Sequence, residues 1–140
     1  MTPQQLEMVR SSYATLGDGG RAMAADFYRR LFDADPSARA LFVESPEMMA
    51  IKFAAELDAI VEAISSYETF APRVHDLAVR HVAYGVQTHH YRTVGEALIG
   101  ALATHLDQVW NADLEAAWRR AYNLVAEMMM VSSSRGDVTT

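Results

Sequence analysis

Cysteine is absent from the 140-residue sequence. Without thiols the chain forms no disulfide, has no thiolate nucleophile, and cannot hold an iron–sulfur cluster or a cysteine-type zinc site. Long hydrophobic runs are also absent, since none approaches the roughly 20 residues that a membrane-spanning helix needs. The N-terminus has an early acidic residue, Glu7, and no apolar stretch of a secretory signal. These absences predict a cytoplasmic protein without a membrane partner.

Basic residues are in deficit. Lys and Arg number 12 against 18 Asp and Glu, for a formal net charge of −6. A negative surface repels phosphate backbones, so we expect no nucleic-acid partner. Hydrophobic residues make up 51% of the chain and charged residues 21%, which is the balance of a soluble globular protein. The length suits one domain with a single substantial core.

Strand patterns are missing too, because no segment alternates apolar and polar residues between turn signals. Helix signals fill the chain instead. Thr2, Pro3 and Gln5 predict a capping box at the first helix, and the dipeptides Asp35-Pro36 and Ser45-Pro46 repeat the cap-and-proline pattern. The helices expected from these signals cover about residues 3–16, 21–34, 36–42, 46–65, 72–85, 93–106 and 113–131.

Several boundaries in this reading depend on single residues. Pro72 is expected to start the fifth helix and Gly85 to end it. Tyr91 or Thr93 would lead into the sixth helix. Asn111 or Asp113 would cap the last one. We expect one domain over residues 1–131, and a polar, disordered tail over 132–140.

The five histidines are scattered, at positions 75, 81, 89, 90 and 105, and none belongs to a zinc-hydrolase motif. His81 differs from the rest in its context. Val74 and Leu77 precede it on one helix face, so His81 ends an apolar stripe. An imidazole at that position can offer one nitrogen to a metal inside the core, as haem iron requires. A surface or structural role remains the alternative from spacing alone.

Four segments carry a family resemblance. They are FYRRLF at residues 27–32 with Pro36 and Leu41-Phe42 after it, RHVAYGV at 80–86, HYRTVG at 90–95, and AWRRAY at 117–122. In this order and spacing, over residues 4–131, they resemble bacterial single-domain haemoglobins and the globin domain of flavohaemoglobins. The resemblance implies an all-α globin fold, with about seven helices in a 3-over-3 arrangement around one haem b.

The resemblance also assigns roles to matching positions. His81 corresponds to the proximal ligand of the iron. Tyr28 corresponds to the distal tyrosine, whose phenol can donate to a bound oxygen molecule. The alternative is a buried tyrosine that bonds to a backbone carbonyl. Phe42 corresponds to the phenylalanine that packs on the porphyrin. Tyr91 corresponds to a tyrosine near the proximal histidine, where it would help to orient the imidazole.

The sequence departs from the family on the distal side. Met49 falls where the family usually has glutamine or histidine, and helical periodicity places it with Phe53 and Leu57 on the inward face, with Met48 turned toward the rim. Methionine cannot donate a hydrogen bond, so it acts either as an apolar gate or as a second ligand of the iron. Lys52 and Arg80 are candidates for binding the haem propionates, with Leu77 beside the haem.

Another departure concerns the proximal side, where flavohaemoglobins place a glutamate near the end of the last helix. Here the corresponding stretch is Ser132-Ser133-Ser134, and Glu127 comes too early. Without a carboxylate behind it, the imidazole of His81 should be less strongly electron-donating.

The expected function is therefore reversible binding of oxygen, nitric oxide or carbon monoxide. Conversion of nitric oxide to nitrate would need an external reductase, because the flavin and nicotinamide domains of flavohaemoglobins have no counterpart in the sequence. Two alternatives stay open. One is a six-coordinate redox or gas-sensor protein with Met49 on or near the iron. The other is a haem-free interaction domain with a globin fold.

Overall fold

The computed structural model describes residues 1–83 and 89–139, with side chains for all of these except 82–83 and 132–139. The described part contains helices and no strands. The α-helices are α1 (Pro3–Ala14), α2 (Gly20–Ala34), α3 (Pro46–Ala63), α4 (Tyr67–Ala83), α5 (His90–Leu106) and α6 (Ala112–Thr139). The 3-10 helices are η1 (Gly17–Gly19), η2 (Pro36–Leu41) and η3 (Asp107–Val109). The α-helices and η2 match the seven expected segments, so the all-α prediction is confirmed.

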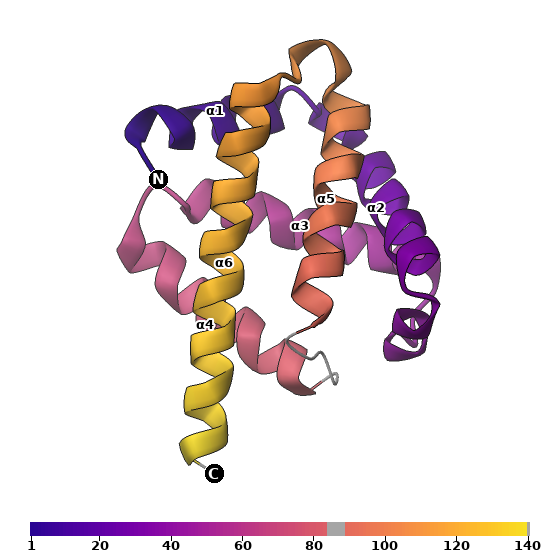
Figure 1. Cartoon of the computed structure of the whole chain (residues 1–140), viewed down its shortest axis with the longest axis vertical. Helices are drawn as coiled ribbons and strands as arrows, with labels where there is room; N and C mark the ends of the chain where they lie inside the picture. Colours follow the sequence, from indigo (N-terminus) through magenta and orange to yellow (C-terminus); the bar gives the residue numbers. More distant parts are fainter. Residues whose placement is uncertain (84–88, 140) are drawn as a thin grey trace.

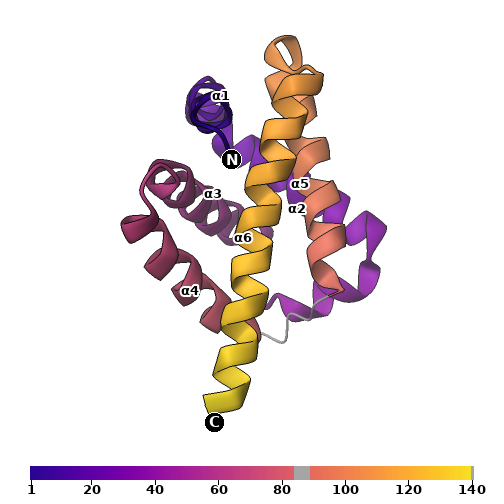
Figure 2. The same ribbon diagram turned by 60° about the vertical axis from the view of Figure 1, so that its left-hand side comes forward.

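The helices form two layers that cross each other. Helices α1, α3 and α4 lie on one side, and α2, α5 and α6 on the other (Figure 2). In Figure 1, α5 and α6 run side by side while α3 crosses behind them. Helix α2 packs on both α3 and α5, and α4 packs on α6. This is the expected 3-over-3 arrangement. Within the described chain, no helix is both long and apolar enough to span a membrane.

Local capping accounts for most helix starts. The Thr2 hydroxyl accepts from the Gln5 N–H at 3.1 Å, and the Gln5 side chain accepts from the Thr2 N–H at 3.0 Å, so the predicted capping box is present. Ser45 caps α3 by accepting from the Met48 N–H at 3.2 Å. At α6 the two candidate caps are now distinguished, because the Asn111 side chain accepts from the Leu114 N–H at 2.8 Å.

The prediction that Pro72 starts a helix is wrong. Helix α4 begins at Tyr67, and Pro72 lies inside it. The turn before the proline is closed by the Phe70 N–H, which donates to the Ser66 carbonyl at 2.8 Å. Phe70 is also buried in the core. A buried phenylalanine stabilises by about 1.5–3 kcal/mol, which offsets the hydrogen bond that the proline removes.

The remaining helix boundaries lie within a few residues of expectation, except at the C-terminal end of α6. Helix α5 begins at His90, one residue before Tyr91. Helix α6 continues to Thr139, so it includes residues 132–139, for which we had expected a disordered tail. The domain boundary at residue 131 stays a prediction. Gly85, the expected end of the fifth helix, lies outside the described residues.

A polar pair inside the core anchors the first helix to the last. The indole N–H of Trp118 in α6 donates to the hydroxyl of Ser12 in α1 at 3.0 Å, and both residues are buried. The ring of Tyr13 lies 6.2 Å from that of Trp118. Because a buried indole N–H without a partner is costly, this bond fixes the position of α1 against α6.

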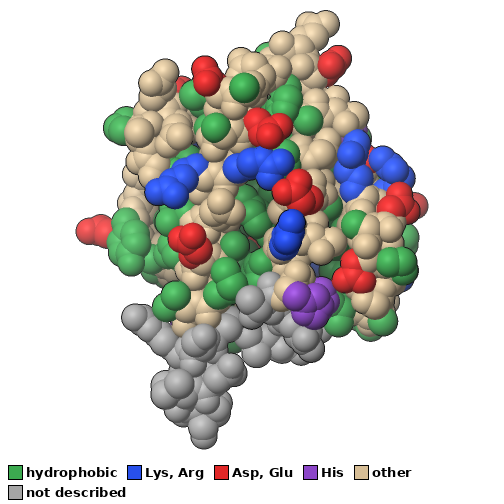
Figure 3. Space-filling view, in the orientation of Figure 1, with side chains coloured by type: hydrophobic (Ala, Val, Ile, Leu, Met, Phe, Trp, Pro, Cys, Tyr) green, Lys and Arg blue, Asp and Glu red, His purple; other side chains and the backbone are tan. Residues whose placement is uncertain are grey.

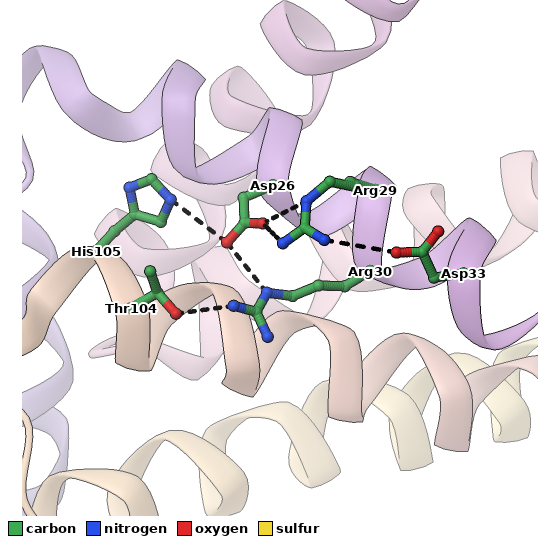
Figure 4. A network of polar contacts seen from close by, with 6 residues as sticks. All are labelled: Asp26, Arg29, Arg30, Asp33, Thr104 and His105. Atoms are coloured by element: carbon green, nitrogen blue, oxygen red, sulfur yellow. Dashed lines mark hydrogen bonds and ion pairs between the residues drawn. The ribbon is translucent and has the colours of Figure 1, made fainter.

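A charged network joins α2 to α5 (Figure 4). The Asp26 carboxylate accepts from Arg29 at 2.5 Å and from Arg30 at 3.0 Å, and it lies 3.4 Å from the imidazole Nε2 of His105. Arg30 also donates to the hydroxyl of Thr104 at 2.8 Å. The network therefore connects the middle of α2 to the C-terminal end of α5.

Charges of both signs alternate on the face that carries α5 and α6 (Figure 3). Arg119 illustrates this, because its guanidinium pairs with Glu96 at 2.8 Å and with Glu115 at 3.1 Å. Exposed pairs of this kind contribute little to stability. They do show that the net negative charge is not gathered into one acidic patch on this face.

Candidate functional site

His81 lies near the end of α4, with one ring nitrogen held by its own helix. Its Nδ1 is 2.8 Å from the carbonyl oxygen of Leu77, one turn earlier. A carbonyl can only accept, so Nδ1 carries the proton and Nε2 keeps its lone pair. Within the described residues, no hydrogen bond engages Nε2. The imidazole is therefore in the tautomer and orientation that a metal ligand needs.

Burial lowers the pKa of His81. The positive charge of Arg80 lowers the pKa further, whereas the Leu77 carbonyl and the negative charge of Glu56 raise it. The net effect leaves the pKa of His81 below its ordinary value. The ring is therefore neutral at neutral pH, and a neutral imidazole is the form that binds iron. On this donor chemistry, the residues present fit an axial ligand of haem iron.

Aromatic rings from three elements surround Tyr28 of α2. Its ring centroid lies 4.9 Å from that of Phe27, 5.4 Å from that of Phe42 and 5.7 Å from that of Phe53. Phe32 follows at 5.9 Å. Phe42 follows η2 and Phe53 lies in α3, so this aromatic cluster brings together segments that are distant in sequence. The cluster forms an apolar wall, and the Tyr28 hydroxyl is its one polar side-chain group.

The Tyr28 hydroxyl keeps its proton over the physiological range. Burial, together with the negative charge of Glu44, raises its pKa to about 12. In the described part of the chain, no protein group hydrogen-bonds to this hydroxyl. A core tyrosine would instead bond to a backbone carbonyl, and Tyr28 makes no such bond to the residues that the structure describes. Its O–H is free to donate to a small ligand.

The inward face of α3 carries the residues expected on the distal side. Met49 is only 4% exposed and Met48 is 44% exposed, in agreement with the predicted orientation of the helix. Leu57 is buried, and Phe53 is half-buried. Leu77, expected beside the haem, is buried in the same core cluster as Leu57.

The two expected propionate ligands are paired with acids. The Lys52 ammonium lies 2.5 Å from the Glu44 carboxylate. Arg80 lies 3.2 Å from Glu56 and 3.2 Å from Asp76. Both basic side chains are substantially exposed, so these pairs are weak and can exchange for another anion.

Tyr91 is held through its backbone. The Tyr122 hydroxyl of α6 donates to the Tyr91 carbonyl at 2.5 Å, which ties the start of α5 to α6. Its expected role in orienting the His81 ring stays a prediction. Residues 84–86 of the 80–86 segment and the side chains of Ser132, Ser133 and Ser134 lie outside the described residues.

Glu44 is a site residue that the sequence did not indicate. One carboxylate oxygen pairs with Lys52, and the other, Oε2, is the one buried side-chain oxygen in the described structure that lacks a hydrogen bond. Its charge acts on Tyr28. The pairing could have been suspected only from the eight-residue separation across the Ser45-Pro46 helix start, which is not a standard signal.

Comparison with known proteins agrees with this architecture. The model of the Globin family matches residues 25–129. The flavohemoprotein of Bordetella parapertussis is 27% identical over 133 residues, covering 93% of this chain and 33% of the relative. Neuroglobin-1 of Oncorhynchus mykiss is 28% identical and is covered over 90% of its length. The chain thus spans about a third of the flavohemoproteins that it matches.

Solved structures lead to the same fold. An engineered carbene transferase, described as a putative nitric oxide dioxygenase from Rhodothermus marinus, superposes with a TM-score of 0.89 at 29% identity, with 99% of this chain and 97% of that chain covered. A hexacoordinated haem protein from an anhydrobiotic tardigrade superposes at 0.85 with 16% identity, over 96% of each chain. The chain belongs to the globin family, and it is a haem-binding globin.

Proposed function

We propose that this globin binds haem b non-covalently, with Nε2 of His81 as the proximal ligand. The supporting observation is the hydrogen bond from Nδ1 to the Leu77 carbonyl at 2.8 Å, which leaves a neutral Nε2 free to coordinate. Attachment through thioether bonds, as in c-type haem, needs cysteines that this chain does not have.

Haem iron supplies reversible binding of oxygen, nitric oxide and carbon monoxide. The chain's own residues set the conditions for that binding. The Leu77 carbonyl fixes the rotation of the imidazole. Phe42 and Phe53 exclude water from the space beside Tyr28. The Tyr28 O–H then donates to the more negative end of a diatomic ligand, in a setting where a hydrogen bond is strong.

The rim residues would hold the haem in its pocket. We propose that Lys52 and Arg80 bind the propionates. To do so, Lys52 must exchange its contact with Glu44, and Arg80 its contacts with Glu56 and Asp76. Because the Lys52 and Arg80 side chains are 64% and 44% exposed, exchanging one carboxylate partner for another costs each cation little free energy.

We further propose that nitric oxide combines with oxygen to give nitrate, with a separate reductase supplying the one electron that the reaction NO + O2 + e⁻ → NO3⁻ consumes. The support is the likeness to flavohemoproteins and to a putative nitric oxide dioxygenase. Tyr28 is the residue of this chain that bears on the reaction, because its protonated phenol would donate a hydrogen bond to an oxygen molecule beside it.

A second candidate rests on Met49, which is buried on the inward face of α3. As a ligand of the iron it would make the protein six-coordinate and raise its reduction potential, as a redox or sensor protein requires. As a gate it would only narrow the path to the iron. The visible spectrum of the ferrous protein without added ligand distinguishes the two roles. Six-coordination by Met49 gives sharp, split bands, and Met49→Leu would abolish them.

The test of the main proposal is the visible spectrum of purified protein, ferric and ferrous, with and without carbon monoxide. We expect a Soret band that shifts on adding carbon monoxide. His81→Ala should lose the normal spectrum and regain it with added imidazole, whereas the exposed-histidine control His75→Ala should behave as wild type. No Soret band after haem reconstitution would select the haem-free interaction domain. Unchanged spectra in His81→Ala would refute the ligand assignment.

A further inference from the structure

Two histidines and an aspartate meet away from the proposed iron ligand. Ligand atoms of Asp35, His89 and His90, one from each residue, all lie within 4.8 Å of one another. Asp35 stands between α2 and η2, His89 precedes α5, and His90 is the first residue of α5. The proposed haem ligand, His81, belongs to α4 and is not part of this cluster.

The Asp35 carboxylate is held in a fixed orientation. Pro36 confines the preceding backbone to extended conformations, and Asp35 has φ −141° and ψ 85°. The Ser37 N–H donates to Oδ1 at 3.1 Å, and the Ser37 hydroxyl donates to the same oxygen at 2.5 Å. Both bonds go to Oδ1, so Ser37 fixes the direction in which the carboxylate faces.

The two imidazoles are arranged around the same point. Their ring centroids lie 4.1 Å apart, with an angle of 43° between the planes. His90 is buried, whereas His89 is exposed and makes no capping hydrogen bond to α5. An ion at this point would therefore be held partly inside the protein and could be reached from solvent.

This donor set selects among metals. Calcium and magnesium prefer all-oxygen sites, whereas two imidazole nitrogens and one carboxylate oxygen are a typical three-residue set for zinc, with water in the fourth position. We propose that Asp35, His89 and His90 bind a Zn²⁺ ion.

The bound ion would reinforce the contact between α2 and α5. The network of Asp26 and Arg30 with Thr104 already joins the middle of α2 to the end of α5 (Figure 4). The zinc site joins the end of α2 to the start of α5, so the two links hold α5 near both of its ends. Helix α2 carries Tyr28, and Tyr91 is the second residue of α5. The zinc site is therefore connected to residues proposed for both sides of the haem.

Calorimetric titration of the haem-loaded protein with Zn²⁺, in a buffer that does not chelate metals, tests the proposal. We expect one site per chain and a higher melting temperature with Zn²⁺ present. His89→Ala and Asp35→Asn should each weaken binding by at least about tenfold and abolish the rise in melting temperature. His89 is exposed, and asparagine keeps an acceptor for Ser37, so both variants should fold.

Matched controls separate this site from adventitious zinc binding. His75→Ala and Asp33→Asn remove an exposed histidine and an exposed aspartate elsewhere, and should leave zinc affinity unchanged. Anomalous scattering from zinc-soaked crystals should place the ion between Asp35, His89 and His90. Equal zinc affinity in wild type and His89→Ala, or an ion found at another site, would overturn the proposal. The haem spectrum is a separate readout, so failure here leaves the proposed function untouched.

Discussion

Replacing Tyr28 by phenylalanine removes one hydroxyl and leaves the aromatic cluster in place. Its ring packs against Phe27, Phe42 and Phe53 at centroid distances of 4.9–5.7 Å, and phenylalanine keeps all three contacts. The phenol is protonated, because its pKa is raised to about 12. The substitution therefore isolates the loss of a hydrogen-bond donor.

The size of the effect follows from the surroundings of the hydroxyl. A hydrogen bond to a partly charged acceptor contributes about 1–3 kcal/mol, or roughly five- to 150-fold in affinity. The Tyr28 hydroxyl breaks no internal bond when it turns to a ligand, and the aromatic wall keeps water from replacing it. We therefore expect the upper half of the range, a rise of roughly 30- to 150-fold in the oxygen dissociation rate.

The assay is stopped-flow displacement of oxygen by carbon monoxide, followed in the Soret region. Carbon monoxide carries less negative charge when bound, so its own dissociation rate should change far less. Tyr67→Phe is the matched control, because Tyr67 is a tyrosine of α4 that is 75% exposed. The oxygen dissociation rate of this variant should equal that of wild type. An oxygen dissociation rate in Tyr28→Phe within about twofold of wild type would refute the reasoning.

Three further substitutions test the fold around the site. Ser12→Ala leaves the buried Trp118 N–H without its acceptor and should lower the free energy of unfolding in urea by about 1–3 kcal/mol. Gly95→Ala would place a Cβ 2.7 Å from the Tyr122 ring, so we expect a loss of about 1–3 kcal/mol by the same measurement. In Asp26→Asn the free energy of unfolding should fall less steeply with decreasing pH than in wild type. The measurement is the free energy of unfolding between pH 5 and pH 2, roughly the range in which carboxylates titrate.

The sign of the Asp26 effect follows from its partners. Burial raises the pKa of this carboxyl, but hydrogen bonds from Arg30 and Arg29 outweigh burial and lower it. A lowered folded-state pKa stabilises the protein above the ordinary carboxyl pKa, and that stability is lost as the pH falls through the lowered value. The exposed residue Asp33 provides the control Asp33→Asn. If the free energy of unfolding falls equally with acid in Asp26→Asn and in wild type, the lowered pKa assigned to Asp26 is contradicted.

The other two predictions also have matched controls. Ser11 is exposed and bonds to Glu7, so Ser11→Ala should leave the stability nearly unchanged. At Gly100 an added Cβ meets the end of the flexible Arg30 side chain, 2.8 Å away, and that side chain can move. Gly100→Ala should therefore be tolerated, because alanine also favours the helix by about 1 kcal/mol. Equal losses at Gly95 and Gly100 would show that the Tyr122 ring does not limit the approach of α5 to α6.

The sequence by itself determined the features that depend on neighbours within one helical turn. The caps at Thr2 and Ser45 bond to residues three positions later, so the local sequence specifies them fully. The same holds for the burial of Met49 in preference to Met48, which follows from helical periodicity. The bond from His81 to Leu77 is likewise confined to one turn.

Only the tertiary structure decided the features that depend on distant partners. The interior position of Pro72 follows from the burial of Phe70, which outweighs local helix preference. The pairing of Lys52 with Glu44 depends on how the chain enters α3, and that of Arg80 with Glu56 on the packing of α4 against α3.

The proximity of Asp35 to His89 and His90 is the clearest feature that only the tertiary structure decides. Each residue is unremarkable in its own segment, and no spacing motif connects them. They come together because α2 packs on α5 and the two helices run in opposite senses (Figure 1), which brings the end of one helix to the start of the other. Long-range proximity of this kind is a product of core packing, and a local pattern of residues carries no record of it.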